Sequence, residues 1–138
     1  MIRFKFLLFL YKKFIILKEV TVNYFSEANR LYNTKEYEEA IKFYQKAVEF
    51  KENEACSYYN SGVCFIKLKN YEGAINMLKK AITLQRDSKY FFNLGYCYAM
   101  KQNNNKALIY FNMSWALDNK DKDCEKAINL ILSKHKKD

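Results

Sequence analysis

Small and apolar residues recur along this chain in a pattern that repeats every 33 or 34 residues. Four classes of position keep this period, and residues three or four apart lie on one face of an α-helix. The classes are Ala28, Gly62 and Gly95; Ala40, Ala74 and Ala107; Tyr44, Leu78 and Phe111; and Ala47, Ala81 and Ser114. A period shared by four position classes predicts an internal repeat.

Each repeat contains two stretches with helical spacing. The first runs through Tyr24, Ala28 and Leu31, and the second through the residues Tyr37, Ala40, Ile41, Tyr44, Ala47 and Val48. A small residue lets the neighbouring helix approach while an aromatic side chain fills the space beside it. We therefore expect an all-α chain of helix pairs, with repeats over residues 21–54, 55–87 and 88–121.

A further helix is expected after the third repeat. Asp121 or Asp123 can cap its start. A stacked array must end in an element with one apolar face, so we interpret residues 122–138 as a capping helix with a basic tail. The residues of its apolar stripe are Cys124, Ala127, Ile128, Ile131, Leu132 and His135.

Residues 1–20 form an apolar and basic segment whose origin stays open. Its longest unbroken apolar run, Phe6 to Tyr11, is too short to span a bilayer, which takes about 20 residues. No Ala, Gly or Ser precedes Ser26, so a signal-peptidase site is not expected. One alternative is a peripheral helix, and membrane attachment is expected only if these residues are made and form an amphipathic helix.

The other alternative is a mis-assigned translation start. Residues 18–21 can be encoded as AAG GAG GTG ACN, which contains a purine-rich bacterial ribosome-binding sequence. Val22 can then be GTG, an alternative start codon, and the first repeat begins there. Under this hypothesis the source is bacterial and residues 1–21 are not translated.

The composition disfavours catalysis. His135 is the single histidine, which removes most schemes that use an imidazole base. The four cysteines contain no C-x-x-C pair, so neither a metal site nor dithiol chemistry is expected, and they are typical of buried thiols in a reducing cytoplasm. We expect no enzyme activity, no catalytic residue, no cofactor and no metal.

The repeat resembles the tetratricopeptide repeat from Thr21 to about Asp121. The stretch that matches it best holds the residues Phe91, Leu94, Gly95, Tyr98, Ala107 and Phe111. The chain departs from the family pattern at Glu27 and Ser61, where Leu is favoured, at Ser114, where Ala is favoured, and in lacking Pro. The resemblance implies an α-solenoid of three helix-turn-helix repeats with the C-terminal capping helix.

The resemblance also implies a groove, lined by the first helix of each repeat, that binds peptides or helices. Transferred to this sequence, the groove residues are Phe25, Asn29, Tyr32, Tyr59, Asn60, Val63, Ile66, Lys89, Phe92 and Tyr96. We therefore expect a cytoplasmic, non-catalytic adaptor or chaperone-like module that binds an apolar peptide or helix of a protein partner. Self-association through the groove stays open.

Some members of the family bind acidic C-terminal peptides of chaperones through a clamp of Lys, Asn, Asn, Lys and Arg. The corresponding residues here are Phe25, Asn29, Asn60, Lys89 and Asn93. Two Asn and one Lys fit this clamp. Without the first Lys and the final Arg, most charge-assisted bonds to a carboxylate are lost, so this activity is not expected.

Charge supports an alternative function. The chain has 24 Lys plus Arg against 15 Asp plus Glu, a net charge of +9, which suits a basic surface that binds nucleic acid or anionic membrane through Lys residues. Only three of these residues are Arg, the better residue for recognising phosphates and base edges. Nucleic acid is therefore the less favoured partner.

Overall fold

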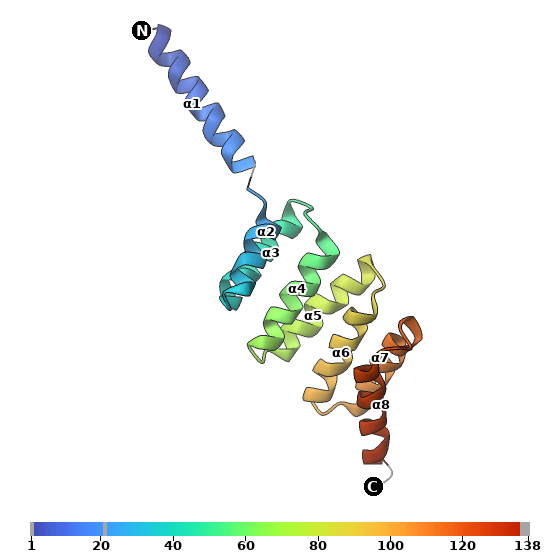
Figure 1. Ribbon diagram of the computed structural model, residues 1–138. Helices are drawn as coiled ribbons and strands as arrows, with labels where there is room; N and C mark the ends of the chain where they lie inside the picture. Colours follow the sequence, from blue (N-terminus) through green and yellow to red (C-terminus); the bar gives the residue numbers. More distant parts are fainter. Residues whose placement is uncertain (1, 21, 136–138) are drawn as a thin grey trace.

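The computed structural model describes residues 2–20 and 22–135, and within these ranges it contains helices and no strand. Each of the helices from α2 to α8 packs mainly on its neighbours in sequence, which is the arrangement of a solenoid (Figure 1). The all-α fold predicted from the sequence is therefore confirmed. The helices are α1 (Ile2–Val20), α2 (Tyr24–Asn33), α3 (Tyr37–Glu49), α4 (Glu54–Lys67), α5 (Tyr71–Leu84), α6 (Ser88–Met100), α7 (Asn104–Leu117) and α8 (Lys122–His135).

Small residues allow the two helices of a pair to approach each other closely. A Cβ atom on Gly95 would lie 2.6 Å from Cδ1 of Phe111, and one on Gly62 would lie 2.9 Å from Cγ of Leu78. These distances are shorter than a van der Waals contact, so each large side chain fills space that the glycine leaves. The contacts join α6 to α7 and α4 to α5, as the repeat pattern predicts.

Polar residues begin and end the helices. Asn23, Asn70, Asp87 and Asn103 each accept a hydrogen bond from a backbone N–H in the first turn of the helix that follows. The turns within the three repeats are made by Lys35, Lys69 and Gln102, which have φ angles of 63°, 58° and 60°. Left-handed backbone of this kind usually takes glycine, so the turns keep their geometry without it.

Helix α8 covers one side of α7. Cys124 and Ile131 are buried, and the Cys124 thiol donates a hydrogen bond to the Phe111 carbonyl oxygen at 3.2 Å. Ala127 and Ile128 pack against the same core, whereas Leu132 is 43% exposed and does not belong to the buried stripe. The side chain of His135 and residues 136–138 lie outside the described residues, as does Thr21, and the repeat boundaries stay a prediction.

Helix α1 extends away from the other helices (Figure 1). Its side chains from Ile2 to Leu17 are all exposed. Among the described residues, no helix is long and apolar enough to cross a membrane. Residues 2–20 of the expected segment are thus helical, and the apolar side chains from Ile2 to Leu17 are exposed.

Candidate functional site

A hollow of about 330 Å³ lies between the first helices of the first two repeats. Both helices carry aromatic, apolar and amide side chains on the facing sides, because the repeat places equivalent positions of α2 and α4 next to each other. Its lining residues are Asn29, Tyr32 and Asn33 from α2, Tyr44 from α3, and Tyr59, Asn60 and Val63 from α4. We refer to it as the α2–α4 hollow.

A polar network crosses the floor of the α2–α4 hollow. The Tyr44 hydroxyl donates to Asn29 Oδ1 at 2.6 Å, and Asn60 Nδ2 donates to the same oxygen at 3.3 Å. Tyr44 is 1% exposed, and this burial raises the pKa of its hydroxyl, which stays protonated and can act as a donor. The network holds the two asparagines together across the hollow.

This network leaves hydrogen-bonding capacity unused. Within the described residues no hydrogen bond uses the amide nitrogen of Asn29 or the carbonyl oxygen of Asn60. The amide nitrogen of Asn29 and the carbonyl oxygen of Asn60 therefore remain as a donor group and an acceptor, on two side chains that the network holds in place. This is the pair of groups that a peptide unit of another chain needs.

Tyr59 forms a rigid wall of the hollow. Its ring stacks on Tyr90 of α6 with ring centroids 4.7 Å apart, and its hydroxyl oxygen accepts from Asn93 Nδ2 at 3.3 Å. Burial raises the pKa of the Tyr59 hydroxyl. A side chain held on two sides loses little entropy when a partner binds, which favours a role as an anchor.

Five of the predicted groove residues meet in this hollow: Asn29, Tyr32, Tyr59, Asn60 and Val63. The other five lie elsewhere. Phe25 packs on Tyr44 and Phe92 on Phe111, with ring centroids 6.1 and 5.4 Å apart, while Ile66 packs against the core. Lys89 and Tyr96 are exposed on α6 and do not line the hollow.

Sequence reasoning missed the contribution of Tyr44. The repeat period groups Tyr44 with Leu78 and Phe111, and its ring occupies the core. Its hydroxyl, however, reaches the hollow and binds Asn29. The signal was a hydroxyl group at a position where the other repeats have purely apolar side chains.

The charges around the site do not form a carboxylate clamp. Phe25 stands at the position of the first clamp lysine, and its backbone N–H binds the Glu52 carboxylate at 2.9 Å. Asn93 stands at the position of the arginine and is bonded to Tyr59. A negative charge therefore lies where the clamp requires a positive one. Among the described residues no group of His, Cys, Asp or Glu side chains is placed to bind a metal ion.

Comparison with known proteins identifies the family. The model of the family described as "Anaphase-promoting complex, cyclosome, subunit 3" matches residues 3–81, more than half of the chain. The chain belongs to this family of tetratricopeptide-repeat proteins. The match covers α1 to α5, and the alternation of small and large residues in the remaining helices continues the same repeat.

A curated relative of this tetratricopeptide-repeat chain is the Hsp70-Hsp90 organising protein of Plasmodium falciparum, with 30% identity over 87 residues, 63% of the chain. The chain spans only 15% of the length of that protein, and 29% and 30% of the lengths of two other curated relatives. The matches therefore cover the repeats and not the whole relatives.

Two solved structures show the same fold. One is YrrB, described as a tetratricopeptide-repeat protein with an unusual peptide-binding site, with a TM-score of 0.76, 26% identity and coverage of 91% of this chain and 65% of YrrB. The other is the first repeat domain of Spaghetti (RPAP3) bound to the HSP90 peptide SRMEEVD. It has a TM-score of 0.76 and 18% identity, and the match covers 80% of this chain and 88% of that domain. Both likenesses extend over most of this chain.

Proposed function

We propose that this protein is a non-catalytic interaction module that binds an apolar peptide or helix of another protein in the α2–α4 hollow. The observation that carries this proposal is the combination of apolar and aromatic walls with the unused amide nitrogen of Asn29 and the unused carbonyl oxygen of Asn60. Such a site can fix the backbone of a peptide and bury its side chain at the same time.

The hollow supplies both affinity and orientation. Tyr32, Tyr59 and Val63 provide the apolar surface, and aromatic side chains in desolvated pockets account for much of the binding energy at interfaces. Asn29 and Asn60 provide the hydrogen bonds that set the direction of the chain. A volume of about 330 Å³ accommodates one or two side chains, so the remaining contacts of a longer peptide would lie on α6 near Tyr96 and Lys89.

The comparisons support this class of function. Peptide binding is stated for YrrB and for the RPAP3 domain, and one curated relative is named as a chaperone organiser. We extend this to an adaptor or chaperone-like role for the present chain. The four cysteines are free thiols, which fits a reducing cytoplasm as its compartment.

Selection from a library of random peptides tests the proposal on the full chain. We expect the selected peptides to be rich in large apolar residues, and NMR shifts of Asn29, Asn60 and Val63 to move on binding. Tyr59→Ala should weaken the selected peptides at least about tenfold, because it removes a fixed aromatic wall. Their affinity should change little with salt, since apolar insertion involves no counterion release.

Tyr58→Ala is the matched control. Tyr58 is the neighbouring aromatic residue on α4, but it lines a different hollow, between α3, α4 and α5. We expect this change to leave peptide affinity within about twofold. Loss of binding with Tyr58→Ala and not with Tyr59→Ala would contradict the proposed site, and steep weakening with salt would favour the basic-surface alternative.

A further inference from the structure

Helix α1 presents an unusually large apolar surface. Twelve of its residues are large, apolar and exposed, and they are Ile2, Phe4, Phe6, Leu7, Leu8, Phe9, Leu10, Tyr11, Phe14, Ile15, Ile16 and Leu17. Isolated apolar residues are normal on protein surfaces, but a contiguous surface of this extent marks a binding site. The question is which partner covers it.

The sequence of α1 resembles the second helix of a repeat. Subtracting 33 from the core positions of α3 gives a face that is apolar throughout, made of Phe4, Leu7, Leu8, Tyr11, Phe14 and Ile15. In α3, however, two of these positions are Ala40 and Ala47, which are fully buried. Their counterparts Leu7 and Phe14 are too large for the close approach that a repeat helix makes.

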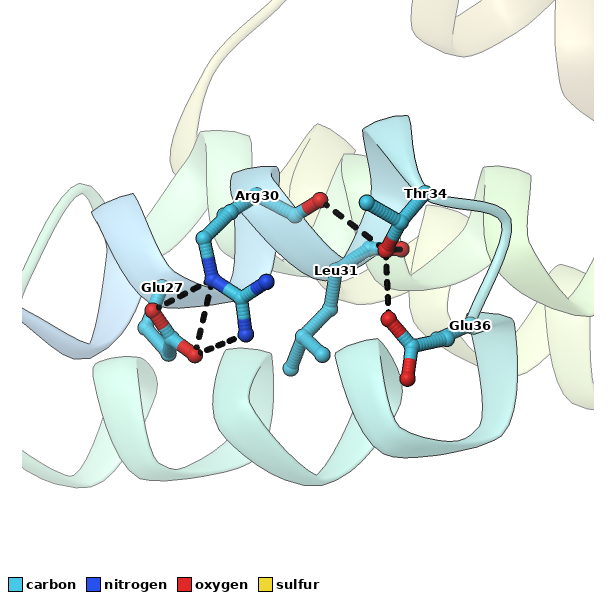
Figure 2. Close-up of polar contacts among 5 residues, drawn as sticks. All are labelled: Glu27, Arg30, Leu31, Thr34 and Glu36. Carbon is cyan, nitrogen blue, oxygen red and sulfur yellow. Dashed lines mark hydrogen bonds and ion pairs between the residues drawn. The ribbon is translucent and has the colours of Figure 1, made fainter.

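The side of α2 that would face α1 offers no apolar surface for it. In the third repeat, Leu94 of α6 is buried against the preceding helix, α5. Glu27 of α2 stands at the same repeat position, so it lies on the side of α2 against which α1 would pack. There Glu27 forms a forked ion pair with Arg30, with an Arg30 Nη2 to Glu27 Oε1 distance of 2.6 Å (Figure 2). A polar outer face is how a repeat array ends.

The charges of α1 distinguish three possible partners: a second copy of α1, the α2–α4 hollow and a lipid surface. Arg3, Lys5, Lys12 and Lys13 are basic, and no acidic residue occurs between Ile2 and Leu17. A second α1 would bring like charges together. The α2–α4 hollow has no carboxylate among its lining residues, so it does not complement a basic helix. An anionic lipid surface offers both an apolar layer and negative charge.

One side of α1 lacks basic residues along most of its length. At 100° per residue, the face that contains Phe4, Tyr11 and Phe14 carries no charge from Ile2 to Leu17. The other side is mixed, with Lys13 placed between Phe6 and Phe9, so α1 offers apolar surface on every side together with its basic residues. Arg3 borders the uncharged face on one side, and Lys5 and Lys12 border it on the other. Long basic side chains reach the headgroups while their stems and the apolar face stay in the lipid.

From these observations we infer that α1 docks the protein onto the surface of an anionic membrane. Helix α1 lies in the interface and does not cross it, since it is too polar to span a bilayer. This inference is independent of the proposed peptide site. It adds a location, because the α2–α4 hollow would then be held beside a lipid surface.

Flotation of the full chain with lipid vesicles tests the inference. We expect the protein to bind vesicles of phosphatidylcholine with 30% phosphatidylglycerol at about 0.1 M salt, and to bind pure phosphatidylcholine at least tenfold more weakly. Lys5→Gln with Lys12→Gln should lower the partition coefficient on anionic vesicles by at least about tenfold. Leu7→Gln with Phe14→Gln should abolish binding to them.

Matched controls remove the same groups from the array. Lys120→Gln with Lys126→Gln deletes two exposed lysines, and Ile109→Gln with Leu130→Gln changes two exposed apolar residues. Both control variants should float like the unchanged protein. Equal losses in the control and α1 variants would overturn the inference, because the contact would then be non-specific.

Three other results would also overturn it. The full chain could remain unbound with anionic vesicles. It could instead form dimers, seen by analytical ultracentrifugation, that dissociate with Leu7→Gln and Phe14→Gln, which would assign the apolar face to a second copy. Finally, a single-stranded oligonucleotide could displace the protein from vesicles through α1, which would assign the basic residues to nucleic acid.

Discussion

The cysteine side chains differ sharply in their surroundings. Cys56 is exposed, whereas Cys64, Cys97 and Cys124 are buried. Burial raises the pKa of the Cys64 and Cys97 thiols to about 12, and it raises that of Cys124 as well. The thiolate is the reactive form, so burial and a raised pKa both slow the reaction of these three thiols.

We predict that one of the four thiols reacts rapidly in the folded protein. With a disulfide reagent at pH 8, Cys56 should be modified first, and the other three should react only after denaturation. Cys56→Ser should abolish the rapid phase and leave the slow phase unchanged. Two thiols reacting at similar fast rates in the folded chain would contradict the burial of the remaining three.

The raised thiol pKa values also predict how stability depends on pH. An unfolded thiol ionises near its ordinary value of 9.0, while folded Cys64 and Cys97 keep their protons until about pH 12. Above pH 9 the unfolded state thus binds fewer protons, and the free energy of unfolding falls as pH rises towards 12. Below pH 9 these two groups contribute no slope.

Urea unfolding at pH 7, 9 and 11 measures this dependence. Cys64→Ala with Cys97→Ala should flatten the decrease between pH 9 and 11, whereas Cys56→Ala should leave it unchanged. Burial also raises the pKa of Cys124, Tyr44, Tyr59 and Tyr90, and these groups contribute to the slope that remains. An identical slope in all three proteins would show that the buried thiols are not its source.

At the scale of the single residue, the sequence predicted faces better than contacts. Helical spacing is enough to place Asn29, Tyr59 and Val63 on related faces, and they do line one hollow. Spacing does not reveal that Phe25 and Phe92 turn towards their own second helices, because that depends on how closely each helix pair packs. Nor does it reveal which hydroxyl reaches which amide, as for Tyr44 and Asn29.

Among the elements, α8 has the clearest energetic role. It contributes Ile131, which is 4% exposed, to the core that includes Phe111 of α7. Its neighbour Leu130 is 59% exposed. These two residues are similar in size and are adjacent on one helix, about 100° apart around its axis, so comparing them isolates the effect of burial.

We expect Ile131→Ala to lower the free energy of unfolding by about 2–4 kcal/mol, since it removes buried methyl groups and leaves a cavity. Leu130→Ala should change it by less than about 0.5 kcal/mol. Urea denaturation followed by circular dichroism compares the two. Equal effects would mean that α8 is not packed on the array and does not act as its cap.

The helices themselves were the most predictable part of the structure. Their positions follow from the period of apolar residues, and their starts from cap residues such as Asn70 and Asp87. The turns at Lys35 and Lys69 were less predictable, because left-handed backbone usually signals itself through glycine. Leu132 was predicted on the apolar stripe of α8 but is 43% exposed, because helical spacing does not show which edge of a stripe meets the neighbouring helix.

For the whole molecule, the repeat period predicts how the helices are arranged in space. Because each helix packs mainly on its sequence neighbours, the order of the helices along the chain is also their order in space, so the solenoid could be predicted without long-range reasoning. Helix α1 is the exception to this rule. It has the spacing of a repeat helix, yet it lacks the small residues, and its neighbour α2 presents Glu27 and Arg30 in place of an apolar face.

The charge pattern of the groove predicts which peptides the array rejects. An acidic C-terminal peptide such as SRMEEVD needs cations at both ends of the site. Here the Glu52 carboxylate binds the backbone of Phe25, and Asn93 is neutral and bonded to Tyr59. We therefore expect the unchanged protein to bind this peptide only weakly.

Phe25→Lys with Asn93→Arg should raise the affinity for SRMEEVD at least about tenfold, because two charge-assisted interactions are added beside Asn29, Asn60 and Lys89. Isothermal titration at 50 and 300 mM salt measures this, and the gain should shrink at the higher salt, since the added contacts are partly exposed.

Phe50→Lys with Asn119→Arg is the control. It adds the same net charge at two exposed positions and should leave the affinity unchanged. Thermal unfolding verifies that the first variant, which alters a half-buried ring, remains folded. Tight binding by the unchanged protein would show that the two asparagines and Lys89 suffice, and equal gains in both variants would show that net charge, not the position of the cations, decides which peptide the groove accepts.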